Sequence, residues 1–169
     1  MERMLFRVGF GTDSHRFESS KVKPLVLGGV CLSHDGGLQA NSDGDVILHA
    51  LFNAISQACG NYSIGYYADE LFKKGITDSR EYLKIALKMA KEKGYRIGNV
   101  GIMVEAKKPY LGQEEVDKIR RSIAELLDIE EDAVGLTFTS GEGLTSFGRG
   151  EGILAQSIVS LYRDDMGHP

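Results

Sequence analysis

Helical and strand-like patterns alternate along the second half of the chain, and this alternation constrains the fold more than any other feature. The pattern predicts helices over residues 79–93, 113–127 and 150–161, with strands over 99–106 and 133–139 between them. A chain with this order buries its apolar surface by packing helices on a sheet. We therefore expect an α/β protein, an α+β sandwich in which helices pack on one face of a mixed β-sheet.

The first half of the chain adds further elements to this pattern. In chain order they are a strand over 5–10, a strand over 24–32 bent by its glycines, a helix over 44–58 and an irregular, mobile loop over 60–77. Ser42 or Asp43 is expected to cap the helix. Because no repeat or linker interrupts the 169 residues, we expect a single domain over residues 1–169.

The composition limits the partners and the location of the protein. A net charge of -4 gives no general attraction to nucleic acid or to an anionic membrane. No apolar run approaches the roughly 18 residues that span a bilayer, and residues 1–7 lack the apolar segment of a signal peptide. We therefore expect a cytoplasmic protein without nucleic-acid or membrane partners. Cys31 and Cys59 lack metal-type spacing, and a reduced pair is favoured over a disulfide.

Three residues in the first half of the chain are candidate metal ligands. Asp13 and His15 are two positions apart, so an extended backbone directs both side chains to one face. His49 lies in the predicted helix over 44–58. Three nitrogen and oxygen ligands with a fourth position left open are typical of catalytic zinc. The alternative, a surface aspartate with two packed histidines, stays open at this point.

Several motifs together resemble one enzyme family over almost the whole chain. The matching segments are residues 7–17, 24–30, 42–51, 78–81, 94–100 and 148–152, which include Ser42-Asp43-Gly44-Asp45 and Gly148-Arg149-Gly150-Glu151-Gly152. On these residues the chain resembles the 2-C-methyl-D-erythritol 2,4-cyclodiphosphate synthase family of the non-mevalonate isoprenoid pathway.

The resemblance implies a reaction and an assembly. It implies a homotrimer with active sites at the subunit interfaces and a nucleotide diphosphate substrate, 4-diphosphocytidyl-2-C-methyl-D-erythritol 2-phosphate. The enzyme would be a phosphorus-oxygen lyase: the 2-phosphate attacks the β-phosphorus, CMP leaves and a cyclic diphosphate forms. By the same resemblance Asp13, His15 and His49 hold Zn²⁺, and Glu142 reaches a second ion, Mg²⁺ or Mn²⁺, between the α- and β-phosphates.

The resemblance also implies the remaining site residues. Asn41 and Ser140 stand at the positions credited with transition-state stabilisation. The implied substrate-binding residues are Asp13, His15, Asn41, Ser42, Ser63, Gly65, Asp69, Ala106, Pro109, Gly112, Thr139, Ser140, Glu142 and Arg149. Among these, the stretch from Ala106 to Gly112 matches the cytosine pocket.

The roles of two charged residues, Asp45 and Arg149, each have two interpretations at this point. Asp45, one turn before His49, either orients that imidazole or is a first-turn acid favoured by the helix dipole. Arg149 either holds an isoprenoid diphosphate or another anion on the threefold axis, or forms a salt bridge with Glu151 or with an acid of a neighbouring subunit.

Five positions depart from the family pattern, mostly in the nucleotide-binding half of the site. They are Asn41 for histidine, Asn53 and Ser63 for aspartates, Tyr110 for lysine and Gln156 for glutamate. Asparagine still donates a hydrogen bond but carries no positive charge. Two alternatives to the synthase therefore stay open: an enzyme of this fold that acts on a related diphosphate, and a non-catalytic trimer that binds metal and isoprenoid diphosphates.

Overall fold

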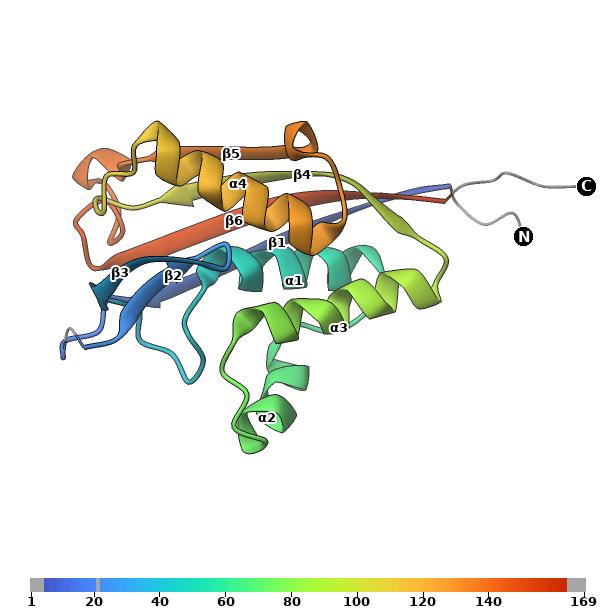
Figure 1. Cartoon of the computed structure of the whole chain (residues 1–169), viewed down its shortest axis with the longest axis horizontal. Helices are drawn as coiled ribbons and strands as arrows, with labels where there is room; N and C mark the ends of the chain where they lie inside the picture. The colour runs from blue at the N-terminus through green and yellow to red at the C-terminus, as the bar shows by residue number, and fades with distance from the viewer. Residues whose placement is uncertain (1–4, 21, 164–169) are drawn as a thin grey trace, which may run out of the picture.

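A computed structural model describes residues 5–20 and 22–163. Its main sheet has the order β1-β6-β4-β5, formed by β1 (Phe6–Arg16), β6 (Gly152–Tyr162), β4 (Arg96–Glu105) and β5 (Val134–Thr139) (Figure 1). β6 pairs antiparallel with both β1 and β4, whereas β4 and β5 are parallel, so the sheet is mixed as predicted. The expected strand over 24–32 is instead a hairpin of β2 (Pro24–Leu27) and β3 (Val30–Gly36), with Gly28 and Gly29 at positive φ in its turn.

Four α-helices accompany the sheet (Figure 1): α1 (Val46–Ala58), α2 (Gly65–Lys73), α3 (Ser79–Glu92) and α4 (Gln113–Leu127). Two short 3₁₀ turns cover Glu131–Ala133 and Gly141–Gly143. α1 contacts β1, β6 and α3, while α4 contacts β5 and β3. In the part of the chain that is described, no helix is long and apolar enough to cross a membrane.

One face of the sheet is buried under α1 and α4 and the other is open. Across the strands, Gly11, Ser157 and Ile102 stand side by side on the buried face. On the opposite face Phe10 and Ile158, which pair across β1 and β6, are 45% and 53% exposed. The expected packing of helices on one face is therefore confirmed.

Two glycines of β1 let α1 lie against the strand at backbone distance. A Cβ at Gly9 would come within 1.9 Å of the Ala54 carbonyl oxygen, and one at Gly11 within 2.0 Å of the Ala50 carbonyl oxygen. Only a residue without a side chain fits at such a contact. Asp13 and His15 follow on the same face of the strand, so this contact places them beside the N-terminal turn of α1.

The predicted helix over residues 150–161 is wrong, because this segment is the strand β6. Its buried residues alternate strictly, from Ile153 through Ala155 to Leu161. β6 lies between β1 and β4, and its other face carries apolar residues such as Ile158 on the open side of the sheet. Apolar residues on both faces hid the two-residue period that identifies a strand.

Residues 60–77 were expected to be irregular, but they contain α2. Half-buried Ile64, Tyr67, Ala68 and Leu71 pack against the core, and their spacing follows one face of a helix. α2 buries no residue fully, so its apolar stripe is weak. That spacing was the signal that could have revealed the helix.

α1 begins at Val46, and its cap is Asp45 rather than Ser42 or Asp43. The Asp45 carboxylate accepts from the backbone N–H of Leu48 at 3.0 Å, and from Gly28 and Gly29 at 2.9 and 2.7 Å. Asp45 therefore ties the β2–β3 turn to the start of α1. Its carboxylate makes these backbone contacts instead of orienting His49, which favours the first-turn interpretation of this residue. Cys31 and Cys59 are both free thiols.

Asp45 makes the stability of the protein depend on pH. Burial raises the pKa of Asp45 from 3.8 to about 6, against the effect of its backbone hydrogen bonds. Between these values the folded state holds a proton that the unfolded state has released, so the free energy of unfolding falls as pH rises, by about 3 kcal/mol in total. Asp45→Asn lacks this titration. We therefore expect the free energy of unfolding of the native chain to fall relative to that of Asp45→Asn between pH 4 and pH 6, so that the difference between the two proteins narrows.

Urea denaturation of the metal-free protein at several pH values measures this difference. Asp132→Asn, at an exposed position, controls for the loss of one carboxylate and should show no such narrowing. A difference for Asp45→Asn that stays constant with pH would contradict the expectation.

Candidate metal centre and active site

Asp13, His15 and His49 meet at the N-terminal turn of α1. The Oδ2 atom of Asp13 lies 3.1 Å from His15 Nε2 and 3.0 Å from His49 Nδ1, and the candidate ligand atoms of all three lie within 4.8 Å of one another. Asp13 and His15 come from the inward face of β1, and His49 from the first turn of α1. The predicted cluster is therefore confirmed as a possible metal site.

The donor set fits a divalent metal ion. His15 Nε2 is buried, and despite its short distance to Asp13 it has no hydrogen bond of acceptable geometry within the described residues. Burial opposes ionisation of Asp13, but the two imidazoles outweigh it and lower the pKa of this carboxyl. Asp13 is thus held as the carboxylate that a cation requires. Two imidazoles and one carboxylate are ligands typical of zinc.

The far side of the His49 ring contacts a residue that the sequence did not single out. Ser79 Oγ, at the start of α3, lies 2.8 Å from His49 Nε2, and Ser42 Oγ lies 3.4 Å from the same nitrogen. Ser79 is fully buried. In the sequence it stands within Asp78-Ser79-Arg80-Glu81, which indicated only a helix start. That start is confirmed, because Asp78 caps α3.

A cavity of about 180 Å³ opens onto the three candidate ligands. Asn41, Ser42 and Asp69 also line it, and so do apolar side chains of α2 such as Phe72. The structure therefore brings these three predicted site residues beside Asp13, His15 and His49. α2, the helix that sequence reasoning missed, supplies one wall.

A lysine supports the loop that carries Asn41. Lys23 Nζ donates to the carbonyl oxygens of Ala40 at 3.0 Å and Ser42 at 2.6 Å, on either side of Asn41. Partial burial lowers the pKa of Lys23, while Glu18 and Asp43 oppose that effect. The lysine places a positive charge behind a loop that lines the cavity.

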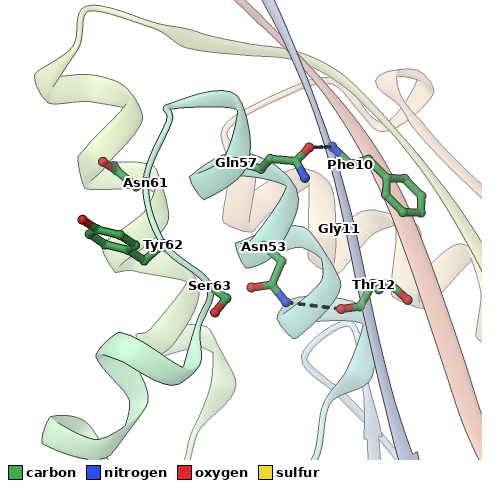
Figure 2. A pocket seen from close by; sticks show the side chains of 8 residues that line it. All are labelled: Phe10, Gly11, Thr12, Asn53, Gln57, Asn61, Tyr62 and Ser63. Atoms are coloured by element: carbon green, nitrogen blue, oxygen red, sulfur yellow. Dashed lines mark hydrogen bonds between the residues drawn. The ribbon is translucent and has the colours of Figure 1, made fainter.

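Ser63 lies in a different cavity, of about 300 Å³, that is lined by β1, α1 and the segment 61–63 (Figure 2). Asn53 and Gln57 of α1 also line it. Asn53 Nδ2 donates to the Thr12 carbonyl at 3.2 Å, and the Gln57 carbonyl oxygen accepts from Phe10 N–H at 2.8 Å (Figure 2). These two side-chain amides pair with two backbone groups on the free edge of β1. Gly65, the first residue of α2, follows Ile64, which lines the cavity at the three ligands.

The loop after β5 carries a second group of predicted site residues. The Thr139 hydroxyl accepts from Gly141 N–H and the Ser140 hydroxyl from Glu142 N–H, each at 3.3 Å. Glu142 is exposed and has φ 47°, a left-handed conformation that is uncommon outside glycine. The Thr145 hydroxyl donates to the buried Glu105 carboxylate, which anchors the loop to the end of β4.

Within one chain the two groups remain apart. Asp13 pairs with Ala155, Ala155 with Val104 and Val104 with Phe138, the residue before Thr139. Asp13 and the end of β5 thus lie at the same level on opposite edges of the sheet. Three strand spacings separate them by about 14 Å. The fold of one chain alone does not bring Glu142 or Ser140 to the three candidate ligands.

The remaining predicted residues lie near the same end of the sheet. Ala106 N–H donates to the Thr139 carbonyl, and Pro109 lines a cavity of about 250 Å³ with Phe17 and Lys108. Gly112 precedes α4 as its N-cap residue. Arg149 donates to Glu151 at 3.2 Å and to the Ser146 hydroxyl at 3.1 Å. The structure thus contains the salt bridge of the second interpretation of Arg149. His168, which matches no ligand position of the family, lies outside the described residues.

Fold and site together define a mixed α/β protein with a possible three-residue metal centre at the edge of its sheet. A model of the YgbB family matches residues 6–162. The chain belongs to this family.

Curated relatives and solved structures agree with the family assignment. A Chlamydia muridarum protein named 2-C-methyl-D-erythritol 2,4-cyclodiphosphate synthase is 46% identical over 159 residues, covering 93% of this chain and 88% of that protein. The bifunctional IspDF of Campylobacter jejuni superposes with a TM-score of 0.85 at 36% identity, over 95% of this chain but only 43% of that longer protein. Plasmodium falciparum IspF, solved as a CDP complex, gives a TM-score of 0.82 at 29% identity, covering 97% of this chain and 100% of that one.

Proposed function

We propose that Asp13, His15 and His49 form the metal centre of a cyclodiphosphate synthase. The chain converts 4-diphosphocytidyl-2-C-methyl-D-erythritol 2-phosphate to 2-C-methyl-D-erythritol 2,4-cyclodiphosphate and CMP, the reaction of the non-mevalonate pathway for which its relatives are named. It is a cyclising, CMP-releasing lyase. The observation that carries this function is the Asp-His-His cluster beside a cavity in a chain that matches the family almost end to end.

The chemistry explains why such a site needs positioning and positive charge more than a nucleophile. An oxygen of the substrate's 2-phosphate forms a bond to the β-phosphorus, and the bond from that phosphorus to the bridging oxygen breaks, so the electron pair leaves with CMP. Two phosphates of like charge must approach, so the main contributions of the protein are orientation and charge stabilisation. A zinc ion held by Asp13, His15 and His49 would supply Lewis acidity at a phosphate oxygen.

The polar side chains of the cavity have separate roles in this proposal. Asn41 and Ser42 donate hydrogen bonds to the phosphates beside the metal centre, and Lys23 holds their loop in place. Asp69 completes this wall of the site. Asn41 and Ser140 stabilise the charge that develops during transfer. The neighbouring cavity that holds Ser63, together with Gly65, receives the ribose.

We propose that the active sites form between the subunits of a homotrimer. Asp13 and Thr139 lie on opposite edges of one sheet, about 14 Å apart. Each chain therefore carries two separate parts of the proposed site. A neighbouring subunit would bring its β5 end, with Thr139, Ser140 and Glu142, to the metal centre. Exposed apolar residues on the open face support such an assembly, and Phe10, Met103 and Ile158 line a cavity of about 330 Å³ there.

The other proposals concern the second ion, the nucleobase and the location. Glu142 would hold Mg²⁺ or Mn²⁺ with the phosphates, and Ala106, Pro109 and Gly112 would border the cytosine. Arg149 would face the threefold axis, where an isoprenoid diphosphate or another anion could bind once its salt bridge to Glu151 opens. We place this single domain, residues 1–169, in the cytoplasm, in keeping with its two free thiols.

One experiment tests the function directly. The purified protein is incubated with the diphosphocytidyl methylerythritol phosphate substrate, zinc and magnesium, and phosphorus NMR follows the products. Equal amounts of CMP and the cyclic diphosphate are expected. Zinc-loaded trimers that form neither product would instead favour the non-catalytic binding function, and slow turnover with a preference for another nucleotide would favour a related diphosphate as the substrate.

Asn41→His restores the residue that is usual in the family. We expect turnover equal to or higher than that of the native chain, because an imidazole keeps the hydrogen-bond donor and adds the capacity for positive charge. Steady-state kinetics of CMP release measures the effect. A large fall in kcat would show that Asn41 has a role specific to the geometry of this chain.

A further inference from the structure

We propose that Asp43 and Ser79 form a relay that fixes the tautomer and orientation of His49 for the metal ion. The inference rests on the metal centre of the proposed function and adds two positioning residues to it. The His49 ring lies between two partners, with Nδ1 at 3.0 Å from Asp13 Oδ2 and Nε2 at 2.8 Å from Ser79 Oγ. Its two nitrogens therefore have different tasks.

The hydrogen bonds of Ser79 determine which nitrogen carries the proton. Ser79 Oγ contacts Asp43 Oδ1, and Ser79 N–H donates to Asp43 Oδ2 at 2.9 Å. In this contact the Ser79 hydroxyl donates to the Asp43 carboxylate oxygen. The serine oxygen then offers a lone pair to His49, so Nε2 carries the hydrogen and donates it. With Nε2 engaged by Ser79, Nδ1 is the nitrogen left for a metal ion, which would lie between it and the Asp13 carboxylate.

Hydrogen bonds from the backbone hold the relay in place. Asp43 N–H donates to the Thr77 carbonyl at 2.8 Å, and Asp45 N–H donates to Asp43 Oδ1 at 3.1 Å. These bonds join the loop before α1 to the segment before α3. Ser79 is fully buried and His49 is only 7% exposed, so water has little access to compete for the ring nitrogen. Ser42 Oγ, at 3.4 Å from Nε2, is the more distant partner.

A histidine that binds metal through one nitrogen commonly donates its other N–H to a fixed acceptor, and loss of that acceptor costs about 10–100-fold in metal affinity. In this chain the acceptor is a hydroxyl whose own direction is set by a carboxylate. Ser79→Ala removes the acceptor. Asp43→Asn keeps the shape but reverses the relay, because its amide can donate to Ser79 and let the hydroxyl donate to His49.

The first measurement is nitrogen NMR of the His49 ring in the zinc-loaded native chain, because without an ion the Asp13 carboxylate, 3.0 Å from Nδ1, would itself accept a proton from that nitrogen. We expect the metal on Nδ1 and a hydrogen-bonded proton on Nε2. In Ser79→Ala and Asp43→Asn the Nε2 proton should lose its acceptor, and zinc affinity, measured by competition with a chelator, should fall by about 10–100-fold. The visible spectrum of the cobalt-loaded variants should change because the ligand geometry changes.

Asp78→Asn is the matched control. Asp78 caps the same helix and hydrogen-bonds Arg80, so its loss disturbs the start of α3 without touching His49. We expect this variant to keep the native tautomer and zinc affinity. Zinc on Nε2 of His49 in the native chain would overturn the relay, and so would folded Ser79→Ala or Asp43→Asn with an unchanged Nε2 proton signal and unchanged zinc affinity. Failure of the native chain to bind zinc would count against the proposed metal centre, whereas native zinc binding with unchanged variants would count against the relay alone.

Discussion

His49→Ala is expected to abolish zinc binding and turnover while the proposed trimer stays assembled. The substitution removes one of three ligands and leaves Asp13 and His15 of β1 without their partner from α1. Since loss of a group that merely orients a ligand costs about 10–100-fold in affinity, loss of the ligand itself should cost more than 100-fold. Turnover should fall by at least about 100-fold, in line with the loss of other electrostatic groups in active sites.

Three measurements check this result: zinc content per chain by elemental analysis, product formation by phosphorus NMR, and mass in solution by light scattering. His49 lies on the helix-covered face of the sheet, away from the open apolar face, so assembly should not change. Tyr82→Phe is the control, because Tyr82 lines the same cavity and packs 6.2 Å from the His49 ring but is outside the ligand cluster. One zinc per chain in purified His49→Ala would show that the metal binds elsewhere.

Gly11→Ala is expected to cause the largest loss of stability of any small substitution proposed. The new methyl would meet the Ala50 carbonyl oxygen at 2.0 Å and the Ala54 nitrogen at 2.4 Å, both backbone atoms of α1. A side-chain rotation cannot relieve such a contact, so helix and strand must separate. Overpacking of a core commonly costs about 1–3 kcal/mol, and a backbone clash belongs at or above the upper end.

The same separation should weaken the metal site, because Asp13 follows Gly11 by two residues and His49 precedes Ala50. We expect zinc affinity and the midpoint of urea unfolding to fall together. Gly101→Ala is the matched control in the same sheet, since a Cβ there meets nothing within 4 Å. If Gly11→Ala were as stable as Gly101→Ala, the close approach of α1 to β1 would not exist in solution.

The elements that the sequence predicted well have one strongly amphipathic face. α4 occupies residues 113–127 as predicted, because Ile119, Ile123 and Leu127 recur at helical spacing among charged residues. The prediction for β6 was wrong because this strand carries apolar residues on both faces, one toward the helices and one toward the open side. Only its neighbours β1 and β4 reveal that it is a central strand. The neighbours of a strand belong to the tertiary structure, and a local sequence pattern does not contain them.

The candidate site divides in a similar way. The cluster of Asp13, His15 and His49 could be predicted, since alternation in a strand and a position in a helix restrict where the side chains point. Ser79 could not, because its contact with His49 depends on how α3 packs against α1, thirty residues away. The roles of Ser140 and Glu142 came only from resemblance to a family and await the predicted assembly.

The backbone contact between β1 and α1 has a consequence for how the protein acquires its metal. The three ligands are carried by a strand and a helix that are held together by Gly9, Gly11 and the alanines opposite them. None of these contacts involves a ligand side chain. Small zinc domains fold only when the ion gathers their ligands, so their metal content and their folded population are the same quantity. For the proposed centre we expect the two to be separate: an ion would fill a template that the backbone contacts already form, so its occupancy could follow the metal supply of the cell while the fold remains unchanged.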